Sequence, residues 1–185
     1  AAFEAEWTRV GAAMRDVLSA DARAAESLAG IRPALVRALA EAAMSQARLS
    51  YAASLEYGRN TEPQYGLYYL GTAQAQRSFL EFARTATTPA GPTPRLRPLG
   101  GEIDALQAEL LAAYRPPASI DRHGEFIATS AAVKEARELD AAGYRHAALL
   151  RYLQAVQRTA MVRSPVAQDR AAVMQRLQES SARLD

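Results

Sequence analysis

Apolar residues recur along most of the chain at intervals of three and four positions, which is the period of an amphipathic α-helix. From Pro33 to about Tyr57, one stripe holds Leu35, Leu39, Ala42, Gln46, Leu49 and Ala53. A second run, from about Glu62 to Ala86, places Tyr65, Tyr69, Ala73, Gln76 and Leu80 in the same way. No stretch alternates β-branched and polar residues with period two, so the pattern predicts an all-α protein without a sheet.

The same period and the capping residues predict the remaining helices. Trp7, Val10, Met14 and Leu18 share one face of a first helix, and Ser19 and Asp21 can cap a short second helix that stops near Gly30. Further helices are expected at 102–114, 125–142, 144–162 and 165–184, with Ser164 capping the last. The total is seven or eight helices, and the short breaks between neighbours favour antiparallel hairpins.

Proline and glycine divide the chain between residues 87 and 101, where four prolines and three glycines occur. Such a segment does not continue a helix and is predicted to be an extended connector or surface loop. It separates an N-terminal helical half, residues 1–86, from a C-terminal half, residues 102–185. At 185 residues, both halves together are expected to form one compact domain that needs no disulfide or metal for its core.

Composition narrows the possible partners. Alanine accounts for 42 residues, and because its side chain buries little area, the core must depend on relatively few large residues. The 22 basic and 20 acidic residues leave a net charge of +2, and the arginines are scattered, so no nucleic-acid partner is expected. No apolar run approaches the roughly 18 residues that span a bilayer, so no membrane span is predicted.

Residues with catalytic or metal-binding chemistry are sparse. Cysteine is absent, and the two histidines, His123 and His146, lack a second ligand at helical metal-site spacing. Both are expected at exposed or rim positions near helix ends. There is no nucleophile elbow and no phosphate-binding glycine loop. The sequence therefore predicts a non-enzymatic protein without cofactor or metal; a helical enzyme using carboxylates such as Glu56 and Glu62 is a further alternative.

The segment from Ala131 to Ala160 has a recognisable pattern of small and aromatic residues. After a turn at Gly143, Ala148, Tyr152 and Ala155 follow at spacings of four and three, and Ala136 and Leu139 precede the turn. This pair of helices resembles a tetratricopeptide repeat, and Leu70 with Gly71 resembles the Leu-Gly step of another. The resemblance implies a hairpin array with a concave surface for peptides or proteins. An irregular bundle with one repeat-like hairpin is the alternative.

Five of the eight tyrosines lie between Tyr51 and Tyr69, together with charged and amide side chains. Tyrosine combines a flat apolar ring with a polar tip, which suits a protein interface or a wet groove. The predicted binding residues are Tyr57, Arg59, Asn60, Glu62, Tyr65, Tyr68 and Tyr69. Alternatively, these rings close the end of an alanine-rich core.

The function predicted from these features is a protein–protein interaction or scaffold module for a protein or peptide partner. The alternative is a small-molecule binding protein with a pocket between the two halves, lined by tyrosine and arginine. The beginning Ala1-Ala2-Phe3 fits a chain from which a signal peptide has been removed. A periplasmic or otherwise exported location is therefore expected, with a cytoplasmic location as the alternative.

Overall fold

The computed structural model describes residues 5, 7–9, 11–12, 28–59, 63–86 and 94–163. The elements in this part are α3 (Ala34–Arg59), α4 (Pro63–Thr85), α5 (Gly100–Ala113), the 3₁₀ turn η2 (Ile120–Arg122), α6 (His123–Ala141) and α7 (Arg145–Arg163). The prediction of an all-α chain is confirmed over this part, which contains no strand. The helices expected at 19–30 and 165–184 lie almost entirely outside the described residues, so they are not tested.

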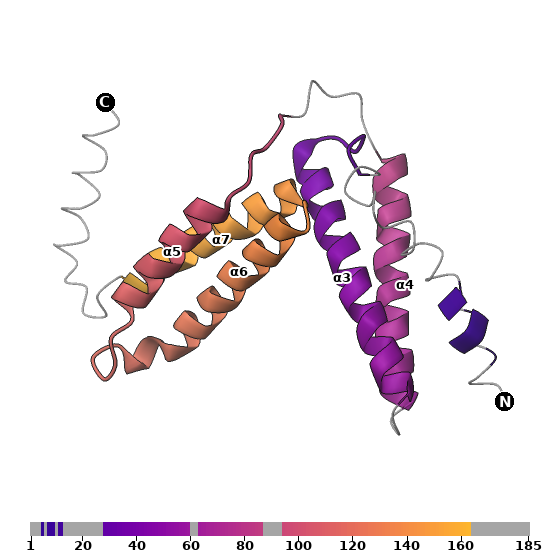
Figure 1. Ribbon diagram of the computed structural model, residues 1–185, viewed down its shortest axis with the longest axis horizontal. Helices are drawn as coiled ribbons and strands as arrows, with labels where there is room; N and C mark the ends of the chain where they lie inside the picture. The colour runs from indigo at the N-terminus through magenta and orange to yellow at the C-terminus, as the bar shows by residue number, and fades with distance from the viewer. Residues whose placement is uncertain are drawn as a thin grey trace.

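The helices form two groups that meet at one place. In the first group α3 and α4 run side by side in opposite directions, and in the second α5, α6 and α7 pack together. The groups are joined by the contact between α3 and α7, and from this contact they diverge (Figure 1). We call the contact between the N-terminal parts of α3 and α7 the junction.

One core continues across the junction, and alanine makes the close approach of the helices possible. It combines residues of α3 and α4 with the α6–α7 turn, including Ala40, Ala43, Met44, Leu70, Leu80, Leu139, Tyr144, Ala147 and Ala148. A second core fills the space between α5, α6 and α7, built on Ile103, Leu106, Leu110, Val133, Ala136, Ala155 and Val162. Because the first core includes residues from both groups, the groups share buried apolar surface.

The turn between α6 and α7 is built as the sequence predicts. Gly143 adopts a positive φ of 84°, a conformation that costs glycine little because it has no Cβ. The Tyr144 N–H donates to the Leu139 carbonyl at 2.9 Å, and the Gly143 N–H donates to the Asp140 carbonyl at 3.0 Å. This pair of hydrogen bonds is a Schellman motif. It ends α6 and turns the chain directly into α7.

The start of α5 differs from the prediction, because Gly100 and Gly101 belong to the helix and not to the connector. Amides at the start of a helix have no intrahelical partner and need another acceptor. The Leu99 N–H donates to Asp140 Oδ2 at 3.1 Å. Residues 94–99 are non-helical as expected, and 87–93 lie outside the described part of the chain. No described helix is long and apolar enough to cross a membrane.

Near their connection, α3 and α4 approach each other through two glycines. A Cβ at Gly66 would lie 2.9 Å from a ring carbon of Trp7 and 3.1 Å from the backbone nitrogen of Gly58. A Cβ at Gly58 would lie 2.4 Å from two carbons of the same indole. Trp7, the only tryptophan, therefore packs against the surface that these glycines leave open.

Alanine substitutions at two glycines of α4 are expected to have opposite effects. Gly66→Ala should lower the free energy of unfolding by about 1–3 kcal/mol, since its methyl group has no space beside Trp7 and the α3 backbone. Gly71→Ala, which meets nothing within 4 Å, should raise it by up to about 1 kcal/mol through helix propensity. Urea unfolding followed by circular dichroism and Trp7 fluorescence measures both. Equal effects of the two substitutions would contradict this packing.

Candidate functional site

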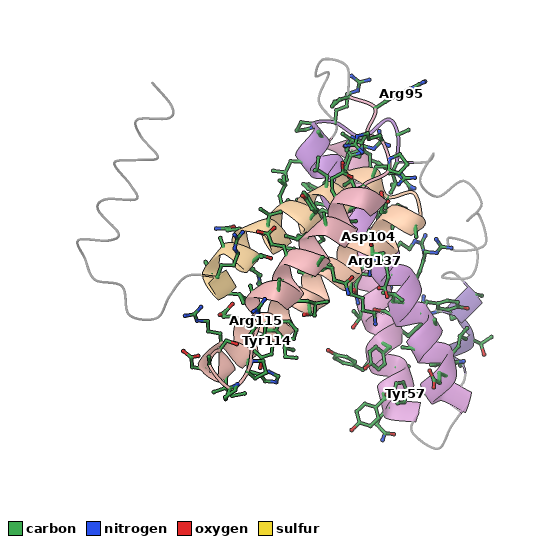
Figure 2. The ribbon with its side chains drawn as sticks, turned by 60° about the vertical axis from the view of Figure 1, so that its left-hand side comes forward. Tyr57, Arg95, Asp104, Tyr114, Arg115 and Arg137 are labelled. Atoms are coloured by element: carbon green, nitrogen blue, oxygen red, sulfur yellow. The ribbon has the colours of Figure 1, made fainter. Side chains whose placement is uncertain are left out.

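Four tyrosines gather at the end of the α3–α4 pair that lies away from the junction. The Tyr57 and Tyr69 rings are stacked, with centroids 5.3 Å apart and an interplanar angle of 13°. Tyr65 lies 5.8 Å from Tyr57, and Tyr68 packs edge-on against Tyr69 at 5.3 Å. We call these four residues the tyrosine cluster; Figure 2 marks its position by Tyr57. Its outer rings are accessible, since Tyr65 is 50% and Tyr68 is 68% exposed.

Some of the predicted binding residues cannot be placed. Asn60, Glu62 and the side chain of Arg59 lie outside the described residues. Tyr51 does not join the tyrosine cluster: it packs against the core, and its hydroxyl donates to the Gly11 carbonyl at 3.3 Å. The structure thus brings four of the seven predicted residues together. Whether they bind a partner stays a prediction.

The tyrosine cluster is one end of a longer face on the α3–α4 pair. On α3, Leu39, Ala42, Gln46, Leu49, Ala53 and Tyr57 follow each other at helical spacing, and on α4 so do Tyr65, Tyr68, Thr72, Gln76 and Phe79. Leu49, midway along this face, is 58% exposed. We call this surface the α3–α4 face. It runs from the tyrosine cluster to the junction, a length of about 27 Å at 1.5 Å per residue.

At the junction the α3–α4 face ends in a shallow cleft of about 370 Å³. Leu39, Ala42, Ala43 and Phe79 supply apolar walls, and the polar side chains at the cleft are Gln46, Gln76, Glu135 and Arg151. The Arg151 Nε donates to Glu135 Oε1 at 2.9 Å, so these two charges largely compensate each other. The cleft lies between the two groups of helices. It contains one arginine and no tyrosine, so the predicted lining by both residue types is not found there.

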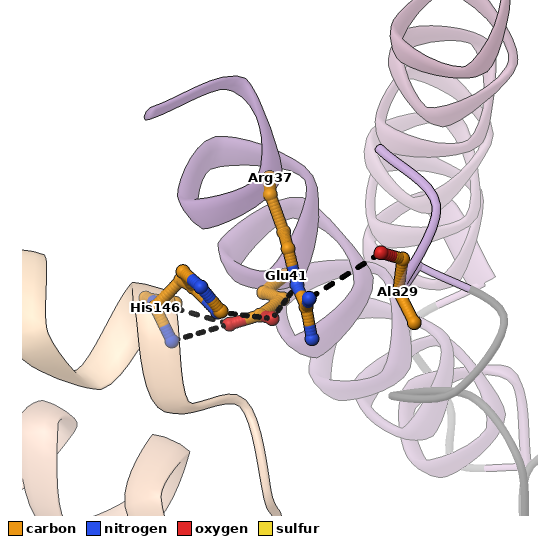
Figure 3. Close-up of polar contacts among 5 residues, drawn as sticks. Ala29, Arg37, Glu41 and His146 are labelled. Carbon is orange, nitrogen blue, oxygen red and sulfur yellow. Dashed lines mark hydrogen bonds and ion pairs between the residues drawn. The ribbon is translucent and has the colours of Figure 1, made fainter. Parts of the chain in front are cut away.

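The junction is organised by a fully buried carboxylate, Glu41 of α3. Its Oε2 accepts hydrogen bonds from the backbone N–H groups of His146 at 2.8 Å and Ala147 at 3.0 Å (Figure 3). These N–H groups belong to the first turn of α7, where amides lack intrahelical partners and the helix dipole favours negative charge. Glu41 therefore caps a helix of the other group.

The second oxygen of Glu41 completes the arrangement. Oε1 lies 2.9 Å from Arg37 Nε and 3.2 Å from His146 Nδ1. Arg37 also donates to the Ala29 carbonyl at 3.4 Å. The Arg37 guanidinium and the two backbone N–H groups donate hydrogen bonds to the carboxylate, and such donors are the condition under which a buried charge is tolerated. Glu41 thus fixes the position of α7 on α3.

Three further polar contacts cross or border the junction. Arg48 of α3 donates to the Tyr144 hydroxyl at 3.2 Å. Asp140, at the end of α6, pairs with Arg145 of α7 as well as capping α5 through Leu99. The ends of α5, α6 and α7 are therefore tied together directly beside the contact with α3.

The expectation of an exposed or rim position for His146 is wrong, because the structure buries this residue at the junction. Burial, and then the positive charge of Arg37, lower the pKa of His146 below its ordinary value, whereas the Glu41 carboxylate and the Pro94 backbone act in the opposite direction. The sequence placed His146 in the first turn of a helix, but a first turn is buried or exposed according to what packs on it. His123 is exposed, as expected, with Nδ1 2.7 Å from the Tyr114 hydroxyl.

Acidification is expected to destabilise the junction through His146. A folded-state pKa below the unfolded value means that, between the two values, the unfolded chain binds more protons. The free energy of unfolding should therefore fall as the pH drops below about 6.5. His146→Asn keeps a donor near Glu41 but does not titrate, so its stability loss between pH 7 and pH 5 should be smaller. Urea unfolding at both pH values tests this, and an unchanged pH dependence would count against the assignment.

The described residues contain no group of three or more His, Asp or Glu side chains arranged to hold a metal ion. His146 is buried beside Glu41, with its Nδ1 3.2 Å from Glu41 Oε1. The contacts of Glu41 with the first turn of α7 position this helix on α3.

Sequence reasoning missed Glu41, although one signal was present. Glu41 is the only acidic residue between Gly30 and Leu55, and its neighbours Ala38 and Ala40 in sequence are small and buried. A lone charge among such residues is often a buried group with a specific partner. Its partners are 105 and 106 residues away in the sequence, and the helical period carries no information about such a distance.

Comparison of the chain with protein-family models, curated proteins and solved structures finds no match.

Proposed function

We propose that this chain is a non-enzymatic protein-interaction module and that a helix of a partner protein docks along the α3–α4 face. The observation that carries the proposal is the run of accessible large side chains on that face, with Leu49, Tyr65 and Tyr68 each at least 50% exposed. Exposed aromatic and leucine side chains gathered on one surface are typical of protein interfaces.

The shape of the face favours a helical partner. A helix-in-groove interface uses apolar anchors at helical spacing, and the α3–α4 face offers complementary apolar positions over about 27 Å. A partner helix of about 18 residues would cover it from the tyrosine cluster to the cleft at the junction. The tyrosines would supply rigid anchors with polar tips at low entropic cost.

The finer architecture belongs to the same proposal. We infer that seven or eight helices are arranged as hairpins and that residues 131–160 are related to a tetratricopeptide repeat. The antiparallel neighbours α6 and α7 and the Gly143 turn support this. Such arrays present extended surfaces to partner proteins.

Removal of two tyrosine rings tests the function. In a pull-down from the native organism with quantitative mass spectrometry, Tyr65→Ala/Tyr68→Ala should lower recovery of a specific protein at least about tenfold, because hot-spot truncations cost about 1–2 kcal/mol or more each. The control Leu111→Ala/Ile127→Ala removes two equally exposed apolar side chains from α5 and α6 and should leave recovery unchanged. Equal recovery with both double variants would refute binding at the α3–α4 face.

A second candidate function is binding of a small molecule at the junction, and the cleft of about 370 Å³ favours it. This volume lies within the range of ligand sites, about 300–1,000 Å³. Native mass spectrometry of the protein isolated from its own organism would then reveal a bound compound. Phe79→Ala, which removes the one aromatic wall of the cleft, should abolish the bound mass. If the measured mass is that of the protein without a ligand, small-molecule binding at the junction is refuted.

A further inference from the structure

A pocket of about 250 Å³ lies between α5 and α6, in the second group of helices. Its apolar lining consists of Leu110, Leu111 and Val133. Leu110 and Val133 are buried and belong to the core of this group, whereas Leu111 is 55% exposed. The pocket therefore reaches from the surface to the core. It shares no residue with the tyrosine cluster or with the cleft at the junction.

The polar side chains of the pocket come mainly from one face of α6. Ser130, Lys134 and Arg137 follow each other at spacings of four and three, which places them on the same side of the helix. Gln107 of α5 completes the polar lining. Figure 2 shows Arg137 beside Asp104, the residue of α5 with which it forms an ion pair. Apolar walls and a row of polar groups thus occupy different parts of one pocket.

The hydrogen-bonding groups that stay available on Arg137 and Gln107 are donors. Arg137 contacts Asp104 Oδ1 at 2.6 Å and Gln107 Oε1 at 2.7 Å, both through Nη2. Its Nε and Nη1 therefore form no hydrogen bond with the described residues. Since the Gln107 oxygen already accepts from Arg137, this side chain offers chiefly its amide N–H groups. A ligand at this position is recognised best if it accepts hydrogen bonds.

Ser130 adds a hydroxyl group that has no partner among the described residues. Its neighbour Thr129 donates to the Glu125 carbonyl at 2.7 Å, and Thr159 of α7 donates to the Ala155 carbonyl at 2.9 Å. Bonds of this kind, from a hydroxyl to the carbonyl one turn earlier, satisfy most serine and threonine side chains inside helices. Ser130 is half-buried and makes no such bond. Its hydroxyl is therefore free to donate to a ligand.

The charges around the pocket favour a ligand with a single negative charge. Lys134 and Arg137 are the charged residues among the described side chains that line it. Asp104 pairs with Arg137, and Glu138 lies 3.8 Å from Lys134, but neither acidic residue lines the pocket. A monoanion meets the two cations directly. A dianion such as phosphate would bring its second charge close to the two carboxylates, which would repel it.

We propose that this pocket binds a small amphipathic carboxylate. The carboxylate group lies at Ser130, Lys134 and Arg137, and the hydrocarbon tail lies against Leu110 and Val133. At about 30 Å³ for each water-sized group, the pocket holds about eight non-hydrogen atoms, which is the size of hexanoate. Apolar walls combined with a few polar groups that fix the orientation of the ligand are typical of small-molecule sites.

Hexanoate, hexanol and acetate together test both parts of this recognition. In a titration followed by NMR of the isotope-labelled protein, hexanoate should shift amide signals of α5 and α6 with a Kd of about 1 mM, as expected for so few atoms. Hexanol has the tail without the charge and should bind at least about fivefold more weakly, because it loses charge-assisted hydrogen bonds. Acetate keeps the charge without the tail and should bind at least about tenfold more weakly.

Two double variants separate the pocket from general effects of charge. Ser130→Ala/Lys134→Ala removes a hydroxyl and a cation from the pocket and should raise the Kd of hexanoate at least about fivefold. The control Ser78→Ala/Arg158→Ala removes the same two groups from exposed positions on α4 and α7 and should leave the Kd unchanged. Alanine favours the helix at all four positions. The NMR spectrum of each variant without ligand establishes that it is folded.

Three results would overturn the proposal. The site would be excluded if hexanoate left the α5 and α6 signals in place at about 20 mM, well above the expected Kd. Equal affinities for hexanol and hexanoate would mean that the polar side chains of α6 recognise no charge. An equal loss of affinity in the two double variants would assign the binding to the overall charge of the protein. The proposed interface on the α3–α4 face is independent of all three results.

Discussion

Glu41→Ala is expected to lower the free energy of unfolding by about 3–5 kcal/mol, the usual cost of breaking a buried ionic network from one side. The substitution leaves the amides of His146 and Ala147 without their acceptor and removes the counter-charge of Arg37. Domains of this kind are stable by only about 5–15 kcal/mol. The loss of a single carboxylate should therefore bring the protein close to unfolding.

Two comparisons isolate the role of this carboxylate. Glu41→Gln keeps an oxygen acceptor but loses the charge, so its effect should lie between those of alanine and the unmodified chain. Glu81→Ala removes the acidic partner of an exposed pair with Arg77 on α4 and should cost less than about 1 kcal/mol. Urea unfolding followed by circular dichroism measures all three variants. If Glu41→Ala and Glu81→Ala had the same effect, Glu41 would not hold the junction.

Tyr144→Ala is expected to lower the free energy of unfolding by about 3–5 kcal/mol, as truncation of a large buried aromatic ring usually does. Tyr144 is among the largest fully buried side chains and belongs to the core that crosses the junction. Its neighbours at the α6–α7 turn are held by the Schellman motif at Gly143. They are therefore poorly placed to fill the cavity, which makes the loss large.

Two further tyrosine substitutions separate the contribution of the buried Tyr144 ring from that of its hydroxyl group. Tyr144→Phe keeps the ring and removes only the hydroxyl that accepts from Arg48, so it should cost about 1 kcal/mol. Tyr65→Ala removes a half-exposed ring of the tyrosine cluster and should cost clearly less than Tyr144→Ala. Thermal and urea unfolding measure the stabilities of these three variants and so rank them. A Tyr65→Ala variant as unstable as Tyr144→Ala would assign the tyrosine cluster to the core and weaken the proposed interface.

These two residues bear on the proposed function because both lie at the contact between the two groups of helices. The cleft at the end of the α3–α4 face takes Glu135 and Arg151 from α6 and α7. If α7 were released from α3, these side chains would leave the cleft, whereas the tyrosine cluster would stay on its own pair of helices. The proposed binding of a partner at the cleft should therefore depend on Glu41, although Glu41 itself is buried.

The helices themselves were largely predictable from the sequence. The stripes of apolar residues indicated α3, α4, α6 and α7 to within about three residues at either end, because a helix with one buried face must repeat its apolar positions every three or four residues. Gly143 marked the α6–α7 turn, since a left-handed position is costly for other residues. The grouping of four tyrosines also followed from pairing α3 with α4.

What only the tertiary structure decided is how the two groups meet. A stripe reports that a face is buried, but not which helix buries it, because alanine and leucine pack equally well on many surfaces. The carboxylate of Glu41 caps α7 across a separation of 105 residues, and His146 is buried for the same reason. Local pattern determines secondary structure through the geometry of one helix, whereas the choice of partner depends on hydrogen bonds that exist only after the chain has folded.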